Sequence, residues 1–305
     1  MVESLRELHN GTIISKIRFI QIGKLLASSK PLCVGVIILF LFSVIAIFEP
    51  LINNYRLEGY SSIFVGRYDK LLPISLEHPL GTDHFGRDLL ALQFTGIKYS
   101  LLIGSLAGCI ATLRAIIVAT IAGYLGGKVD AVLNAFTNGV LVIPTLPILI
   151  VLAAYVRMDL LLMSITLAFF SWPWTARIIR SQILSIKERP FVELAKISGQ
   201  NSWEIMFFEI MPNLGPYLGV GLSISIIGAM FAETGLRLLG LGPGEIPTLG
   251  LLLSWSLTFG ALSQGYYQMV VAPATFLILI FISFNLINVG LEETFNPRLK
   301  KVTGV

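Results

Sequence analysis

The chain has 305 residues, of which 13% are charged and 55% are hydrophobic, and its formal net charge is +4 at pH 7. Soluble domains contain about 25% charged and about 45–50% apolar residues. With a mean hydropathy of +0.80, this composition excludes an ordinary soluble domain and indicates a protein that crosses a membrane several times. Cys33 and Cys109 both lie in apolar runs, so we expect small core residues without a disulfide.

The N-terminal segment, residues 1–30, carries basic residues on an amphipathic background. We expect either a cytosolic arm that lies along the inner membrane face or a partly ordered tail. A first membrane span is predicted at 31–52. No small-residue cleavage site follows it, so a retained anchor is favoured over a signal sequence. The polar residues 53–97 are then expected outside the membrane.

This outer connection contains the run HPLGTDHFGRD, residues 78–88. Its candidate turn, cap and ion-pair residues are Gly81, Asp83, Gly86, Arg87 and Asp88. The glycines permit tight turns, and the aspartates can cap helix starts or pair with the arginine. His78 and His84 beside these acids raise the possibility of a metal, but caps and ion pairs explain the acids better. We therefore predict no metal site.

Five further spans are predicted at 100–125, 131–155, 159–179, 213–234 and 269–291. Together with the first they give an all-α polytopic membrane protein with six transmembrane helices. Gly104 and Gly108 in the second span favour close helix packing. Residues 243–268 are expected outside the membrane, with 249–255 as the part that would dip back into it. Segments that this topology places in the cytosol hold twice as many Lys and Arg residues as the outer segments, which favours both termini inside.

Three residues within the predicted spans are candidates for a transport path. Pro144, with Pro147, is expected to kink the third span and release backbone carbonyls. Asn138 lies one turn and a half earlier. Arg114 lies near the middle of the second span, where a charge that faces lipid costs about 2.5–3.5 kcal/mol on insertion scales. We expect Arg114 either to face the path or to be paired with backbone carbonyls or with an acid on a partner.

Residues 187–212 form the one long polar interruption in the second half of the chain. Pro190 suits a first helical position. The residues expected to share one apolar side of a short helix are Phe191, Leu194, Ala195 and Ile197. Gly199 is typical of a helix C-terminus, where positive φ is often needed. Ser202 can cap a second short helix, which Pro212 is expected to end.

The spacing of Glu193, Ala195, Gly199 and Pro212 resembles the EAA loop of ABC importer permeases, although Leu194 replaces the middle alanine and Glu209 occupies an apolar position. The PLGTD-x-x-GRD run resembles the oligopeptide, dipeptide and nickel branch of that family. Further matching residues are Gly123, Tyr124, Gly126, Gly127, Asp130, Ile143, Pro144, Trp172, Pro173, Ala176, Arg177, Arg180 and Glu233. The resemblance covers roughly residues 78–300. Asn138 lies near a position where the branch usually has an acid, and Arg237 departs from the pattern.

The resemblance implies a type I importer permease fold and a non-catalytic subunit, multi-pass in the cell membrane. In that family the loop forms a coupling helix that fits a groove on a cytosolic ATPase. The residues expected to couple are Pro190, Phe191, Glu193, Leu194, Ala195, Ile197, Ser198, Gly199 and Trp203. The implied organisation starts with an arm at 1–30, a first helix at 31–52 and an outer loop at 53–97. A five-helix core follows at 98–291 and contains the coupling loop 187–212. A cytosolic tail at 292–305 ends the chain.

The implied partners are a second homologous permease, two ATPase subunits and an extracytoplasmic substrate-binding protein, with no nucleic acid. No cofactor is expected in this chain, and ATP and Mg would be bound by the partner subunits. The implied substrates are di- or oligopeptides, with oligosaccharides or a nickel chelate as alternatives.

The sequence argues against two other functions. An ion-coupled secondary transporter needs ionisable groups within the bilayer, and the predicted spans have no Asp or Glu well inside them. An intramembrane enzyme needs clustered nucleophile, base or metal ligands, and the sequence shows no such cluster. The chain also has no G-x-x-x-x-GK[ST] phosphate-binding loop, so the energy is expected to come from a partner.

Overall fold

The structure is a computed structural model that describes residues 29–295, so the predicted N-terminal arm and C-terminal tail lie almost wholly outside the described residues. Every regular element in this range is a helix. The long helices are α2 (Lys30–Arg56), α3 (Leu89–Leu125), α4 (Gly127–Val142), α5 (Thr145–Tyr155), α6 (Leu160–Ile186), α10 (Gly215–Leu238), α11 (Leu249–Thr258) and α12 (Gln268–Phe295). The short ones are α7 (Pro190–Ile197), α8 (Ser202–Glu204), the π-helix η1 (Ile205–Ile210) and α9 (Met211–Asn213).

Four helices within the described range, α2, α3, α10 and α12, are long and apolar enough to cross a membrane. The helices α4 and α5 form a fifth candidate if they are taken as one span, bent by 72° at the break between them. The helix α6 has 27 residues but is not among these candidates. The all-helical fold is therefore confirmed, whereas six spans and the orientation of the termini stay predictions.

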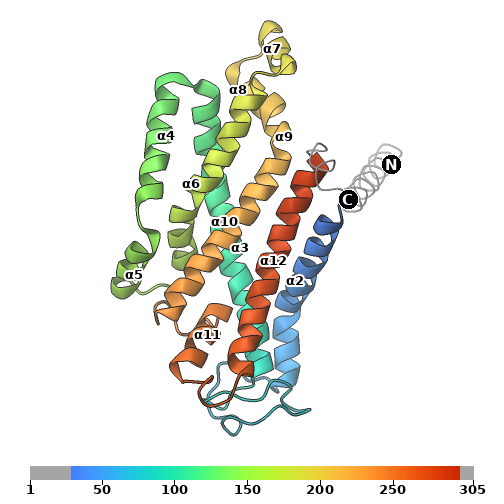
Figure 1. Cartoon of the computed structure of the whole chain (residues 1–305), viewed down its shortest axis with the longest axis vertical. Coiled ribbons are helices and arrows are strands. Elements are labelled where there is room, and N and C mark those ends of the chain that lie inside the picture. The colour runs from blue at the N-terminus through green and yellow to red at the C-terminus, as the bar shows by residue number, and fades with distance from the viewer. Residues whose placement is uncertain (1–28, 296–305) are drawn as a thin grey trace, which may run out of the picture.

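The long helices form an elongated bundle (Figure 1). The start of α2 and the end of α12 lie toward the half of the bundle from which α7 projects, and α11 and the connection 57–88 lie at the opposite end. We call these the α7 end and the α11 end. This polarity is the one that the six-span prediction requires, because α7 and both termini were expected on one side.

The helix α3 runs through the middle of the bundle, between α6 and α10 (Figure 1). Its face toward α6 carries a row of small buried residues, Ala107, Ala111, Ala115 and Ala119. A Cβ on Gly108 would lie only 3.0 Å from the backbone nitrogen of Ile226 on α10. Small residues let helices approach closely, as the glycine pattern in the second span predicts. Close packing on two sides makes α3 the central support of the fold.

Two helices extend well beyond their predicted bounds at the α11 end: α2 reaches Arg56 and α3 begins at Leu89. The polar residues that misled the sequence prediction are paired between the two helices. Glu49 accepts a hydrogen bond from Lys98 Nζ at 2.8 Å, and Asn53 Nδ2 donates to Thr95 Oγ1 at 3.0 Å. Because these charges have partners, the helices continue where a polar loop was expected.

Candidate functional site

The polar segment that follows α6 forms a compact group of short helices that projects beyond the bundle (Figure 1). Arg189 has extended backbone geometry, and Pro190 is the first residue of α7. Proline fits this position because the first N–H groups of a helix have no partner within it. The predicted start of the helix is therefore confirmed.

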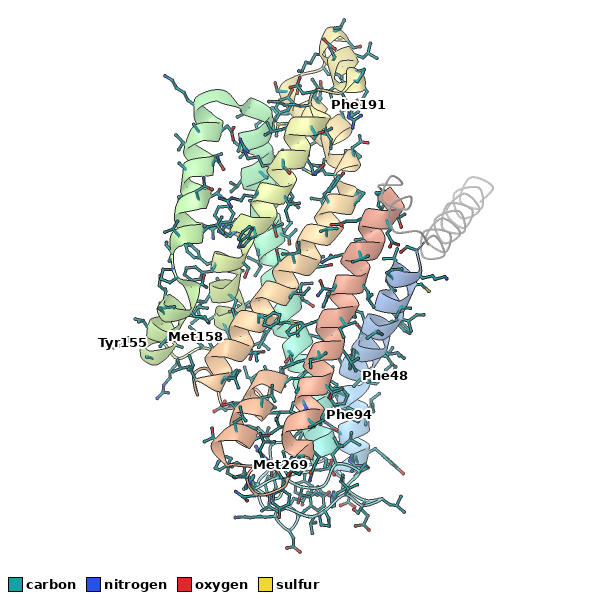
Figure 2. The ribbon with its side chains drawn as sticks, viewed as in Figure 1. Phe48, Phe94, Tyr155, Met158, Phe191 and Met269 are labelled. Carbon is teal, nitrogen blue, oxygen red and sulfur yellow. The ribbon has the colours of Figure 1, made fainter. Side chains whose placement is uncertain are left out.

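The two apolar sides of α7 have different surroundings. Val192 and Ala195 are 0% and 6% exposed and pack into the main core, the hydrophobic cluster built largely from α3 and α6. Leu194 and Ile197 are 63% and 79% exposed. Phe191 is half-buried against the core (Figure 2). The prediction of one apolar face shared by all four predicted residues was wrong. Ala195 anchors the helix, and its outer side presents Leu194 and Ile197.

The C-terminus of α7 is closed by a Schellman motif. Gly199 has φ +83°, its N–H donates to the carbonyl of Lys196, and the N–H of Gln200 donates to the carbonyl of Ala195. This pair of bonds satisfies carbonyl groups that the helix itself leaves free. The predicted helix stop at a glycine with positive φ is confirmed, and Ser198 is the preceding C-cap residue.

The next helix begins one residue earlier than predicted, because Asn201 and not Ser202 is its N-cap. Asn201 Oδ1 accepts from the N–H of Glu204 at 2.9 Å, and Glu204 Oε2 accepts from the N–H of Asn201 at 2.8 Å. Such a capping box satisfies two free donors at once, which a serine one residue further along would not do. The turn from α7 to α8 is thus fixed at both ends.

Pro212 does not end the helix, contrary to expectation. The chain instead passes through the π-helix η1 and continues into α9, where Pro212 lies in the first turn. In η1 the N–H of Met211 donates to the carbonyl of Met206. Proline has no N–H to donate, and the wider π-turn before it accommodates this loss without ending the helix.

Five large apolar side chains of this segment are exposed. We call this surface the apolar patch: Leu194, Ile197, Trp203, Phe207 and Phe208. The rings of Trp203 and Phe207 stack at 6.3 Å with an interplanar angle of 19°. A cluster of exposed large apolar residues on a projecting element is typical of a protein-interaction surface.

Polar contacts tie this end of α6 to its neighbours. Arg180 donates to both carboxylate oxygens of Asp130 at 2.6 and 2.5 Å, and Arg177 donates to Asn138 Oδ1 at 2.5 Å. Lys187 Nζ donates to the carbonyl of Gly123, in the last turn of α3, at 3.2 Å. The first two contacts bring together residues that the sequence marked separately on α4 and α6. The base of α4 is therefore fixed to α6 just before α7 begins.

The predicted kink at Pro144 is confirmed as the break between α4 and α5. A cavity of about 260 Å³ lies beside it. Its lining residues are Val140, Leu141, Thr145, Leu167, Phe170, Ser171, Trp174, Ile224, Gly228 and Ala232, from α4, α5, α6 and α10. We call it the inner cavity. Irregular backbone at membrane depth is tolerated where it is buried in protein or lines a cavity, and Thr145, next to the break, lines this one.

Arg114 contacts aromatic rings of α6. Its guanidinium carbon lies 4.7 Å from the ring centroid of Phe169 and 5.2 Å from that of Trp172. Among the described residues it has no hydrogen-bond or ion-pair partner. Cation–π contacts contribute about 0.5–2 kcal/mol and offset part of the cost of a charge at membrane depth. Neither Arg114 nor Asn138 lines the inner cavity, so their role in a transport path stays a prediction.

Sequence reasoning missed a buried ion pair on α10. Glu233 and Arg237 are 2% and 0% exposed, and Arg237 Nε donates to Glu233 Oε1 at 2.9 Å. Arg237 Nη1 also donates to the carbonyl of Pro243 at 2.6 Å, and Thr248 Oγ1 donates to Glu233 Oε1 at 2.6 Å. The i, i+4 spacing of two opposite charges in an apolar helix was the available signal. The pair holds the connection between α10 and α11 against the bundle.

Residues 115–301 match the sequence pattern of a protein family described as "Binding-protein-dependent transport system inner membrane component". The chain belongs to this family. It is 30% identical to the oligopeptide transport system permease protein OppC of Bacillus subtilis over 275 residues, 90% of this chain and 88% of the relative. It is 31% identical to the dipeptide transport system permease protein DppC of Alkalihalophilus pseudofirmus, over 91% of this chain and 89% of the relative.

The chain is therefore an inner-membrane permease, a non-catalytic component of an ABC transport system that works with a binding protein. The predicted family, membrane location and absence of an enzymatic role of its own are confirmed. Neither the two ATPase subunits nor the second permease are tested by these comparisons, so they stay predictions.

The α11 end of this permease is closed by the PLGTD-x-x-GRD run. Gly81 and Gly86 have φ +78° and +69°, as predicted for tight turns. Asp88 caps α3 by accepting from the N–H of Ala91 at 2.9 Å, and Arg87 Nε donates to Asp83 Oδ2 at 2.7 Å. The predicted caps and ion pair are confirmed, and the run forms a folded cap on the bundle.

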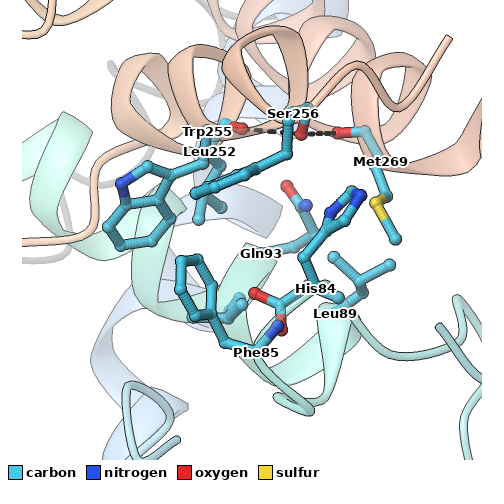
Figure 3. A pocket seen from close by; sticks show the side chains of 11 residues that line it. His84, Phe85, Leu89, Gln93, Leu252, Trp255, Ser256 and Met269 are labelled. Atoms are coloured by element: carbon cyan, nitrogen blue, oxygen red, sulfur yellow. Dashed lines mark hydrogen bonds between the residues drawn. The ribbon is translucent and has the colours of Figure 1, made fainter. Parts of the chain in front are cut away.

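A small cavity of about 20 Å³ lies between this cap, α3 and α11 (Figure 3). His84, Gln93 and Trp255 are among the residues that line it. Both amide atoms of Gln93 and Nε2 of His84 are buried without a hydrogen-bond partner in the described part of the chain. The volume is enough for one water molecule, and the three polar atoms are suitable partners for it. His78 lies elsewhere in the cap, with Nδ1 2.6 Å from Asp88 Oδ2.

The charge on Asp88 makes the stability of the cap depend on pH. Burial by itself raises the pKa of Asp88, but hydrogen bonds from Arg56, His78 and the N–H of Ala91 outweigh it and hold the pKa below its ordinary value. The resulting stabilisation is fully present above the ordinary pKa of about 3.9 and is lost as the pH falls through the lower folded-state value.

We therefore expect Asp88→Asn, which keeps a helix cap but removes the charge, to lower the melting temperature at neutral pH. The difference from the unsubstituted protein should shrink as the pH falls below about 4. Glu58→Gln is the matched control, because Glu58 pairs with Arg67 but is exposed, and it should change the melting temperature little at any pH. A difference that grows in acid would contradict the assignment.

Proposed function

We propose that this permease forms half of the translocation path of an ATP-driven peptide importer. Di- and oligopeptides are the proposed substrates. The support is the similarity, at about 30% identity over most of the chain, to permeases named for oligopeptide and dipeptide transport. The other half would be a second, related permease, and two ATPase subunits with bound ATP and Mg would supply the energy.

The main support for a role of α7 in coupling to the ATPase is the apolar patch, which lies on a helix that is fixed to the bundle. The patch is exposed, and its helix α7 is held from behind by Val192 and Ala195 in the core. Both ends of the turn from α7 to α8 are closed by side-chain or backbone hydrogen bonds. A helix that is fixed to the bundle and apolar on its outer side is suited to move as one body with a partner that binds it.

In this mechanism, ATP binding draws the ATPase subunits together, and each moves the α7 of its permease. The contact of Arg180 with Asp130 connects α6 to α4 and so to the break at Pro144. Movement at α7 would therefore reach the wall of the inner cavity. Alternating access follows if this wall re-packs between an outward and an inward arrangement.

The test is uptake into liposomes that contain the whole transporter, purified with its partners. Radiolabelled tri-alanine should accumulate only with ATP inside and the binding protein outside. An oligosaccharide and a nickel chelate are tested in parallel, because either could be the substrate instead. Accumulation driven by a proton or sodium gradient without ATP would refute the proposal, and accumulation of the sugar or chelate alone would refute the peptide assignment.

A further inference from the structure

A second, larger cavity opens where the chain turns from α5 into α6. Its volume is about 720 Å³, and it is lined by residues 153–159 and by residues 242–245, which follow α10. Tyr155 and Met158 mark this part of the molecule in Figure 2. We call it the outer cavity. Binding sites for small molecules typically have volumes of about 300–1,000 Å³, so this cavity is large enough for a short peptide.

One wall of the outer cavity is held by the buried ion pair of α10. Arg237 donates to the carbonyls of Pro243 and Ile246 at 2.6 and 3.3 Å. Gly242 has φ +102°, and a Cβ there would lie 3.2 Å from Nη1 of Arg237. The loop thus passes directly over a charged group that is itself fixed by Glu233. This wall is therefore preformed.

The opposite wall is also anchored. Met158 is buried in the main core, and Asp159 caps α6 by accepting from the N–H of Leu162 at 2.7 Å. Besides Asp159, whose carboxylate caps α6, the cavity is lined by two residues of opposite charge, Arg157 on this wall and Glu245 on the other. Within the described chain neither of these two exposed side chains has an ion-pair partner. Both are available to a ligand.

The outer and inner cavities lie along one seam, the contact between α5 and α10. The outer cavity is lined by the last residues of α5 and by the loop after α10, and the inner cavity by Thr145 at the start of α5 and by Gly228 and Ala232 of α10. Between them α5 contacts α10, where a Cβ on Gly235 would lie 3.4 Å from Leu146. A solute received in the outer cavity would have the inner cavity next along this seam.

We propose that the outer cavity is a vestibule that receives a zwitterionic peptide by its two ends, a step that rests on the proposed peptide transport. Arg157 binds the terminal carboxylate, and Glu245 binds the terminal ammonium group. Two opposite charges on two separately fixed walls match a molecule with one charge at each end. A guanidinium also suits a carboxylate, because it can donate two parallel hydrogen bonds to it.

The experiment compares peptides with free and blocked ends in the reconstituted transporter. Arg157→Gln should lower kcat/KM about tenfold for tri-alanine, as expected for the loss of one charge-assisted hydrogen bond, but not for tri-alanine amide. Glu245→Gln should lower it for tri-alanine but not for the N-acetylated peptide. Each value is divided by that of the unsubstituted transporter with the same binding protein, so the preference of the binding protein cancels.

Arg67→Gln is the matched control, because Arg67 is a cation of the connection 57–88 that pairs with Glu58 and does not line the outer cavity. It should leave uptake of every peptide unchanged. Equal losses for free and blocked peptides in the Arg157→Gln or Glu245→Gln transporter would overturn the vestibule, and so would no loss at all. Both results leave peptide transport intact, whereas uptake of no peptide by the unsubstituted transporter would overturn the proposed function itself and the vestibule with it.

Discussion

Replacing Gly199 with valine is expected to abolish substrate-stimulated ATP hydrolysis while the permease still inserts and assembles. Gly199 has φ +83°, and an added Cβ would have no atom within 4 Å. The penalty is therefore conformational and not steric. A left-handed backbone costs an ordinary residue about 1–2 kcal/mol, and a β-branched residue resists it further. The hydrogen bonds that close α7 would be lost, and α7 would no longer move as one body with its partner.

The measurement is ATPase activity of the reconstituted transporter with and without binding protein and peptide. Gly199→Asn is the matched control, because asparagine adopts positive φ more readily than other residues with a side chain, and it should retain most of the stimulation. Full stimulation in the Gly199→Val transporter would show that the closed end of α7 is not needed for coupling.

Replacing Arg237 with methionine is expected to destabilise the permease strongly, by about 3–5 kcal/mol, because Glu233 would remain buried as a charge without its cation. The carbonyls of Pro243 and Ile246 would also lose their donor. The readout is the thermal unfolding midpoint of the purified transporter, together with protease sensitivity of the connection between α10 and α11.

The double variant Glu233→Gln with Arg237→Met separates the two contributions. Removing both charges should recover much of the stability that the single variant loses, because the buried charge is gone. The connection should still be sensitive to protease, since its carbonyls remain without Arg237. If the single variant melts like the unsubstituted protein, the ion pair is not a stabilising element.

The features that were correctly predicted from sequence depend on local chain geometry. Gly199 ends α7, Pro144 breaks the third span and Asp88 caps α3, because each requirement is set within a few residues of the chain. Glycine indicates positive φ, proline a helix break and aspartate a helix N-cap, so each can be read from the residue type itself. The same reasoning placed the cap of α8 one residue late, since Asn201 and Ser202 are both good cap residues and only the partner Glu204 decides between them.

The features that were missed depend on contacts between distant parts of the chain. Periodicity grouped Ala195 with Leu194 and Ile197 as one apolar side of a helix, but it carries no information on which side meets the core. The partner of Arg180 is Asp130, fifty residues away, and the carbonyls held by Arg237 belong to a loop without a recognisable motif. The cavities are likewise formed by several helices at once.

The break between α4 and α5 is a potential hinge beside the inner cavity. The helix α4 of this bent pair is bound to α6 through Asp130, and the helix α5 contacts α10 through Leu146. The two halves meet at 72° without a continuous helical hydrogen-bond ladder between them. Under the proposed coupling, a movement that begins at α7 would rotate α4 about this break while α5 stays against α10, so the break is where the wall of the inner cavity would re-pack.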